Sequence, residues 1–161
     1  MELNWTIRFF DELSPHELYE IIWLRNEVFV VEQNCLFQDA DHKDLKAWHL
    51  MGWGATGGLA AYCRLLPPGV SYEAASIGRV VTHADVRGTG AGKLLLQQAI
   101  HHCASLFGEG PIEIGAQLYL KAFYESMGFV QAGAVYLEDG IEHIHMVKTE
   151  RGAGNFTKGP E

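Results

Sequence analysis

The sequence is poor in cysteine, in basic residues and in long apolar runs. Its 161 residues include only three cysteines and no CxxC pair, which excludes a disulfide framework and indicates a reducing, cytoplasmic setting. Lysine and arginine number 12 against 20 acidic residues, a net charge of −8, so no basic field is present to hold a nucleic acid. No stretch has the length and apolarity of a membrane span, and the first residues lack the basic start of an export signal.

The composition is otherwise that of a folded globular protein. Hydrophobic residues make up 48% and charged residues 20% of the chain. This length fits one domain, which we place at residues 1–150. Residues 151–161 have no hydrophobic periodicity and are predicted to form a disordered tail.

The first third of the chain shows one strand and one helix. Apolar and polar side chains alternate over residues 5–9, as they do in a half-buried strand. The sequence SPHE at 14–17 combines an N-cap hydroxyl, a proline at the first helical position and a capping-box carboxylate, and apolar residues then follow at helical spacing to Phe29. Residues 30–46 are polar and rich in carboxylates, which indicates an exposed connection that rims a site.

The rest of the chain mixes strands and helices. The apolar runs 47–53 and 59–66 flank the turn sequence GATGG and predict an antiparallel hairpin. Further strands are expected at 77–81, 112–116, 129–136 and 141–148, and helices at 91–107 and 118–127. The first of these helices is expected to share one face among Leu94, Leu95, Gln98 and His102. This order predicts an α/β protein with a mixed sheet and helices packed on it.

The most informative segment is residues 77–96, IGRVVTHADVRGTGAGKLLL, in which a strand, a glycine loop and a helix follow one another. Three glycines at alternate positions permit positive φ and a close approach of ligand to backbone, and the first N–H groups of the helix are unpaired. Arg87 and Lys93 add positive charge. The segment predicts a site for a phosphate or pyrophosphate; a turn without a ligand is the alternative for a glycine cluster taken alone.

Two other nucleotide motifs do not fit these glycines. The NTPase loop GxxxxGK[ST] needs a glycine at Arg87 and a hydroxyl residue at Leu94. The dinucleotide fingerprint GxGxxG needs its third glycine at Lys93.

The loop RGTGAG at 87–92 resembles the [QR]xxGx[GA] loop of the GNAT acyltransferases, which cradles the pyrophosphate of acyl-CoA. The segment QLYLKAFYESMGF at 117–129 is similar to the later helix of that family and its exit. RNEVFVVEQN at 25–34 and QDAD at 38–41 resemble the ElaA-type branch, so the resemblance covers nearly the whole chain.

The resemblance implies the GNAT fold, a mixed but mostly antiparallel, splayed sheet with helices on both faces. It implies acetyl-CoA as co-substrate, no metal, and direct acetyl transfer to the primary amine of a small molecule or peptide. Contacts to coenzyme A fall on Val80, Val81, Arg87, Gly88, Thr89, Gly90, Ala91, Gly92, Lys93, Gln117, Phe123 and Tyr124. Gln117 stands where the family commonly has asparagine.

The same resemblance gives two residues a catalytic role. Val81 or its neighbour would offer a backbone N–H to the thioester oxygen, and Tyr124 would protonate the departing thiolate. The alternative for Tyr124 is a ring that only packs against the sheet.

The general base is left open, because the strand before the loop contains no carboxylate where the family often has a glutamate. His83, just past that strand, is the first candidate, since histidine titrates near neutral pH. More distant candidates are Glu32, His49, Glu113 and His145.

The acceptor end is assigned to Arg25, Glu32, His49 and Arg79, with Asp39 and Asp41 as acidic groups that would attract a cationic amine. A metal site is not expected: His101 and His102 are adjacent and diverge on a helix, and only His143 and His145 share a strand face.

Two other functions stay open. One is a non-catalytic module that binds coenzyme A for sensing or regulation, and the other is an interaction domain without a ligand. A homodimer is compatible with each of them.

Overall fold

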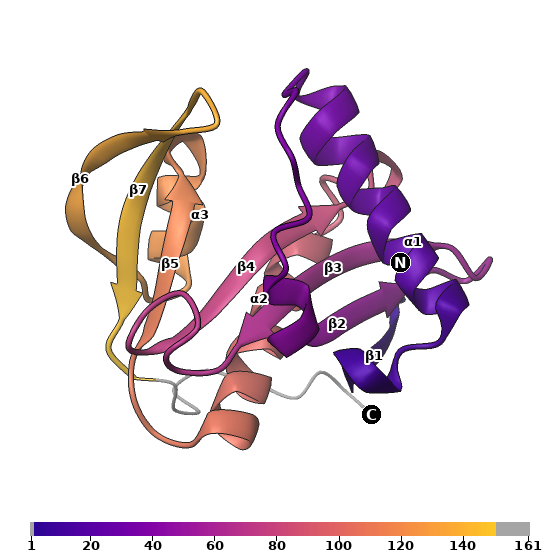
Figure 1. The fold of residues 1–161 in the computed structure, drawn as a ribbon, viewed down its shortest axis with the longest axis horizontal. Helices are drawn as coiled ribbons and strands as arrows, with labels where there is room; N and C mark the ends of the chain where they lie inside the picture. Colours follow the sequence, from indigo (N-terminus) through magenta and orange to yellow (C-terminus); the bar gives the residue numbers. More distant parts are fainter. Residues whose placement is uncertain (1, 151–161) are drawn as a thin grey trace.

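The described strands form one seven-stranded sheet in the order β1-β2-β3-β4-β5-β7-β6 (Figure 1). A computed structural model describes residues 2–150, so the tail predicted at 151–161 lies outside the described residues. The strands are β1 Asn4–Phe9, β2 Trp48–Trp53, β3 Leu59–Leu66, β4 Ala75–Thr82, β5 Ile112–Gln117, β6 Val130–Glu138 and β7 Ile141–Lys148. Neighbouring strands are antiparallel except β4 and β5, which are parallel.

Helices cover both faces of this sheet, as predicted. The helices are α1 Pro15–Arg25, α2 Ala91–Phe107 and α3 Lys121–Ser126. Figure 1 shows α1 on the near face and α2 behind the strands. The helices that the structure describes all lack the length and apolarity needed to cross a bilayer.

Helix α1 begins with the predicted capping box. The Ser14 hydroxyl accepts a hydrogen bond from the Glu17 N–H at 3.0 Å, and the Ser14 N–H donates to the Glu17 carboxylate at 2.9 Å. After Arg25 the chain continues as a π-helical segment, Asn26–Glu32. The exposed connection was expected from residue 30; it begins later because the N–H groups of Gln33 and Cys35 still bond to carbonyls five residues back.

Two apolar layers result from these helices. On one face Ile21 and Leu24 of α1 pack with Met51, Tyr62 and Val81 of the sheet. On the other face α2 and α3 pack against the sheet, and the buried side chains of α2 are Ala91, Leu95, Leu96, Ala99 and Cys103.

The predicted face of α2 was wrong by one position. Leu95 is buried, but Leu94 is 45% exposed, and Gln98 and His102 are only partly buried. The buried residues recur every four positions from Ala91 to Cys103. The buried face therefore includes Ala99 and Cys103 in place of the predicted Gln98 and His102.

The sheet is splayed between β4 and β5. These two strands pair only at Ala75 with Ile112 and at Ser76 with Glu113, and they then diverge (Figure 1). The register between β3 and β4 shifts opposite Tyr62 and Arg64, and Arg79 has a φ of +49°. A bulge bends the strand that carries it, which accounts for the departure of β4 from β5.

Candidate active site

The glycine loop after β4 leads into the N-terminus of α2. Gly88 and Gly90 have φ of +78° and +88°, a conformation that other residues rarely adopt, and Gly90 is the N-cap of α2. A Cβ atom at either glycine would meet nothing within 4 Å, so the space above the loop is open. No side chain caps α2, which leaves its first N–H groups to an external acceptor such as an anion.

A cavity of about 1020 Å³ extends from this loop into the gap between β4 and β5. This volume is at the upper end of the range for ligand pockets, about 300–1,000 Å³. Its wall includes much of β4, the second half of β5, the segment around Gln33 and the β6–β7 turn. The loop contributes Arg87, Gly88, Gly90, Ala91, Gly92 and Lys93.

Most of the predicted site residues lie on this wall. Besides the loop, they are Val80, Val81, Gln117, Phe123, Tyr124, Glu32 and Arg79. The distant base candidates Glu113 and His145, which lie 3.8 Å from each other, do not line the cavity, and neither do four further predicted residues: Thr89, His83, Arg25 and His49.

Each of these four has another local partner. The Thr89 hydroxyl donates to the Val86 carbonyl. The Nδ1 atom of His83 accepts from the Asp85 N–H at 3.1 Å, and the ring stacks on Trp23. Both nitrogens of His49, which is fully buried, are occupied by the Tyr62 hydroxyl and the Asp44 carbonyl. Arg25 is bonded to the carboxylates of Asp39 and Asp44.

The edge of β4 that faces the gap has no strand partner beyond Ser76 among the described residues. The His83 N–H donates to the Ala60 carbonyl of β3 at 2.8 Å. Because successive backbone groups of a strand point to opposite sides, the Val81 N–H faces β3, whereas those of Val80 and Thr82 face the gap. The geometry favours Val80, the neighbour of Val81, as the donor to a ligand.

Arg87 contacts Glu32 from the π-helical segment. Its guanidinium donates to both carboxylate oxygens, with 3.0 Å between Nη2 and Oε2, and also to the Thr82 carbonyl at 3.2 Å. This pairing raises the pKa of Arg87 and lowers that of Glu32. The positive charge of Arg87 is therefore partly neutralised by the Glu32 carboxylate.

Tyr124 is on the cavity wall and is only 6% exposed. Its ring makes edge contacts with Phe123 and Phe129, at centroid distances of 5.3 and 5.9 Å. Burial raises the pKa of the Tyr124 phenol, so the hydroxyl stays protonated at neutral pH. The Tyr124 ring packs in the core and also lines the cavity, so its position is compatible both with a packing role and with a role as proton donor.

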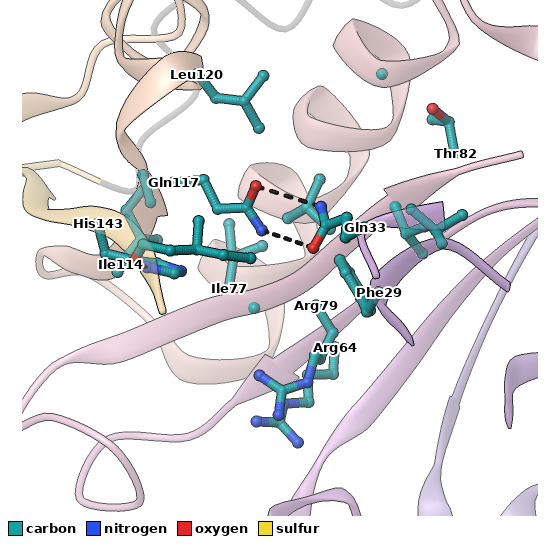
Figure 2. A pocket seen from close by; sticks show the side chains of 18 of the residues that line it. Phe29, Gln33, Arg64, Ile77, Arg79, Thr82, Ile114, Gln117, Leu120 and His143 are labelled. Atoms are coloured by element: carbon teal, nitrogen blue, oxygen red, sulfur yellow. Dashed lines mark hydrogen bonds between the residues drawn. The ribbon is translucent and has the colours of Figure 1, made fainter. Parts of the chain in front are cut away.

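Gln33 and Gln117 face each other across the cavity (Figure 2). Their side-chain amides form two reciprocal hydrogen bonds, at 3.4 and 3.5 Å. Gln117 ends β5 and Gln33 follows the π-helical segment, so this pair joins the two sides of the gap.

Three arginines and three aspartates form a network at the cavity, and four of them, Arg64, Arg79, Asp39 and Asp41, line its wall. Arg25, which is 3% exposed, bonds Asp39 and Asp44, each at 2.7 Å. Arg64, which is 4% exposed, bonds Asp41 and Asp44. Arg79 lies 2.9 Å from Asp39. These contacts fix the loop that carries the aspartates.

Sequence reasoning missed Gln33 and Arg64. Arg64 did leave a signal, since it is the only charged residue in the apolar run LAAYCRLL of β3. A lone charge in a fully buried strand indicates a buried ion pair. Gln33 gave no such signal, because its partner Gln117 is 84 positions away. Among the described residues, no group of three or more His, Cys, Asp or Glu side chains is placed to hold a metal ion.

Comparison with known proteins gives consistent matches. Residues 53–150 match a family model described as "Acetyltransferase (GNAT) domain". The UPF0039 protein sll0451 of Synechocystis is 41% identical over 147 residues, which cover 91% of this chain and 96% of that protein. The crystal structure of an acyl-CoA N-acyltransferase from Pseudomonas aeruginosa has a TM-score of 0.87 at 42% identity and covers 92% of this chain and all of that one. The crystal structure of Escherichia coli ElaA has a TM-score of 0.84 at 38% identity, with coverages of 91% and 99%.

Proposed function

This chain belongs to the GNAT acetyltransferase family, in the branch of ElaA and the UPF0039 proteins, and we propose that it transfers an acetyl group from acetyl-CoA to a primary amine. The family resemblance drawn from the loop and the later helix is thereby confirmed. One observation supports the proposed reaction: the cavity runs from the open glycine loop into the gap between β4 and β5.

The residues present fit a coenzyme A diphosphate at the loop. The uncapped N-terminus of the 17-residue helix α2 presents N–H groups to it, and Lys93 adds charge beside them. The unpaired edge of β4 offers backbone groups to the amide-containing arm of the cofactor, as an added strand would.

The chemistry needs no nucleophilic side chain. The amine nitrogen attacks the thioester carbon, and the Val80 N–H stabilises the charge that develops on the oxygen, an effect of about 3–4 kcal/mol per donor. The carbon–sulfur bond then breaks, and the protonated phenol of Tyr124 donates to the thiolate. Holding both substrates in one cavity supplies the orientation that makes direct attack effective.

The acceptor is proposed to be a small molecule or a peptide that carries the amine. The alternative is a protein of the same fold that binds coenzyme A without catalysis, which the lack of a carboxylate on β4 keeps open.

One experiment separates these functions. Purified protein is given acetyl-CoA and a panel of amines, thiol release is measured, and thermal unfolding is followed with and without coenzyme A. The proposed enzyme releases thiol with at least one amine and is stabilised by coenzyme A. Stabilisation without thiol release would indicate the non-catalytic module, and no stabilisation would contradict the coenzyme A site altogether.

A further inference from the structure

His143 is, of the histidines that the structure describes, the one on the cavity wall. It belongs to β7, where it pairs in register with Gln117 of β5, and it is 9% exposed. Figure 2 shows it beside Gln117, on the side of the cavity opposite Gln33. Resting on the proposed acetyl transfer, we propose that His143 is the base that takes the proton from the acceptor ammonium.

The hydrogen bond of the ring fixes which nitrogen does this. The Nδ1 atom lies 2.7 Å from the carbonyl oxygen of Ile141. A carbonyl only accepts hydrogen bonds, so Nδ1 carries the hydrogen and Nε2 carries the lone pair in the neutral ring. Among the described residues no hydrogen bond occupies Nε2, which leaves it able to accept a proton.

Three side chains on the neighbouring strands surround the His143 ring. The carboxylate of Glu138 on β6 lies 3.6 Å from Nε2. The Tyr136 ring, also on β6, stacks at a centroid distance of 5.8 Å and fixes the orientation of the imidazole. On β5 the facing residue is the uncharged Gln117. Glu138 is thus the charged group among these neighbours, and its carboxylate can accept a hydrogen bond from Nε2 once Nε2 carries a proton.

Three other carboxylates on the wall are held by cations, whereas Glu138 and Asp139 lie exposed at its outer rim. Glu32 is paired with Arg87, which lowers its pKa and makes it a weaker base. Burial alone would raise the pKa of Asp41, but the ion pair with Arg64 lowers it overall. Asp39 is bonded to Arg25 and Arg79. These three carboxylates are paired with arginines, whereas no hydrogen bond is formed by Nε2 of His143 among the described residues.

The proton steps balance as follows. The Nε2 atom of His143 takes one proton from R–NH3⁺ and later releases it to solvent. The free amine forms the N–C bond, the C–S bond breaks, and Tyr124 passes its proton to the thiolate. The tyrosinate recovers a proton from the acceptor nitrogen, which still carries the extra proton left by the attack of the neutral amine, and the neutral amide results. The products are the acetylated amine, coenzyme A thiol and one released proton.

The test compares wild type with His143→Gln over a pH series, using an acceptor amine found active with wild type. General-base catalysis contributes about 10²–10⁴-fold, so we expect kcat/KM of the variant to fall by about a hundredfold at pH 7. The deficit shrinks as pH rises towards the pKa of the amine, about 10.4 for a lysine-like group, because the substrate then deprotonates without help. A merely structural role would cost the same factor at every pH.

Two further variants keep the outcome decisive. His143→Asn retains a donor near the Nδ1 position and should show the same pH-dependent deficit if the Gln variant does not fold. His16→Gln is the control, since His16 is an exposed histidine of α1 off the cavity wall, and it should keep the wild-type pH profile. A folded His143 variant with the wild-type profile, or a deficit equal at all pH values, overturns the inference while the acetyl transfer stands. A wild-type protein inactive with every amine would contradict the transfer itself.

Discussion

Arg87 of the glycine loop donates to both carboxylate oxygens of Glu32, which lies 55 positions earlier in the chain. The same guanidinium is expected to attract the diphosphate of coenzyme A, so Glu32 competes for it. We predict that Glu32→Gln tightens coenzyme A binding by about two- to fivefold, the size of an exposed ion pair. Isothermal titration calorimetry measures this change.

The control for this variant is Glu27→Gln, an exposed residue of the same π-helical segment that loses the same charge. Its affinity should equal that of wild type. Equal or weaker binding by Glu32→Gln would mean that Glu32 orients Arg87 for the ligand instead of competing with it.

Reversal of charge at Arg87 should have the opposite effect. Arg87→Glu places a carboxylate beside the expected diphosphate, and we predict at least about tenfold weaker binding of coenzyme A. This loss of affinity should become smaller at high salt, because the side chains of Arg87 and Glu32 are partly exposed and salt screens exposed charges. Arg8→Glu, on the distant strand β1, makes the same charge change and should leave the affinity unaltered. Unchanged affinity of Arg87→Glu would count against the loop as the diphosphate site.

Tyr124→Phe should slow turnover without abolishing it. A general acid contributes about 10²-fold or more, but water can still protonate a thiolate, so we expect kcat to fall by about ten- to a hundredfold. The melting temperature should change little, because no hydrogen bond to the phenol is lost among the described residues. Tyr19→Phe, at an exposed position of α1, is the control. A kcat equal to that of wild type would leave Tyr124 a packing residue only.

Arg64 should be essential for stability. Arg64→Met removes the buried partner of Asp41 and one of the two arginines that bond Asp44, and loss of one member of a buried ion pair costs about 3–5 kcal/mol of unfolding free energy. Urea denaturation measures this value. Arg8→Met removes the exposed pair with Glu17 and should cost less than about 1 kcal/mol. Similar losses in the two variants would show that the network of arginines and aspartates is not a stabilising unit.

The same network predicts that the unfolding free energy falls at acid pH. Burial alone would raise the pKa values of Asp41 and Asp44, but their ion pairs with Arg64 and Arg25 lower both overall. A carboxyl with a lowered folded pKa stabilises the protein above its unfolded pKa and loses this contribution as pH falls through the folded value. Unfolding free energy should therefore decline below about pH 4. Asp41→Asn should decline less steeply there, and an identical slope would contradict the assignment.

Local patterns predicted most of the fold. The capping box of Ser14 and Glu17, the hairpin around GATGG and the helix Ala91–Phe107 each depend on neighbours in the sequence. The glycine loop was equally legible, because positive φ at Gly88 and Gly90 follows from residue type. Where prediction failed, as for Leu94, the pattern was ambiguous by one residue, and packing against the sheet decided it.

The site was predictable only where one segment supplies it. His83 looked suitable because it follows β4, yet the ring caps the turn after the strand and stacks on Trp23. The Gln33–Gln117 pair and the position of His143 depend on which strands become neighbours, and no local pattern contains that information. Long-range pairing of strands decides which polar residues become neighbours on the cavity wall.

The junction between β4 and β5 comprises only two residue pairs, at Ala75 and Ser76. With so few backbone hydrogen bonds, β4 and β5 hold the two parts of the sheet, β1 to β4 and β5 to β7, together only weakly. Side-chain hydrogen bonds such as those between Gln33 and Gln117 add a second link across the gap. A molecule lodged in the opening touches both halves at once, so its affinity adds directly to the resistance of the whole protein to coming apart. A bound substrate would therefore take over part of the role that backbone hydrogen bonds between β4 and β5 have in a continuous sheet.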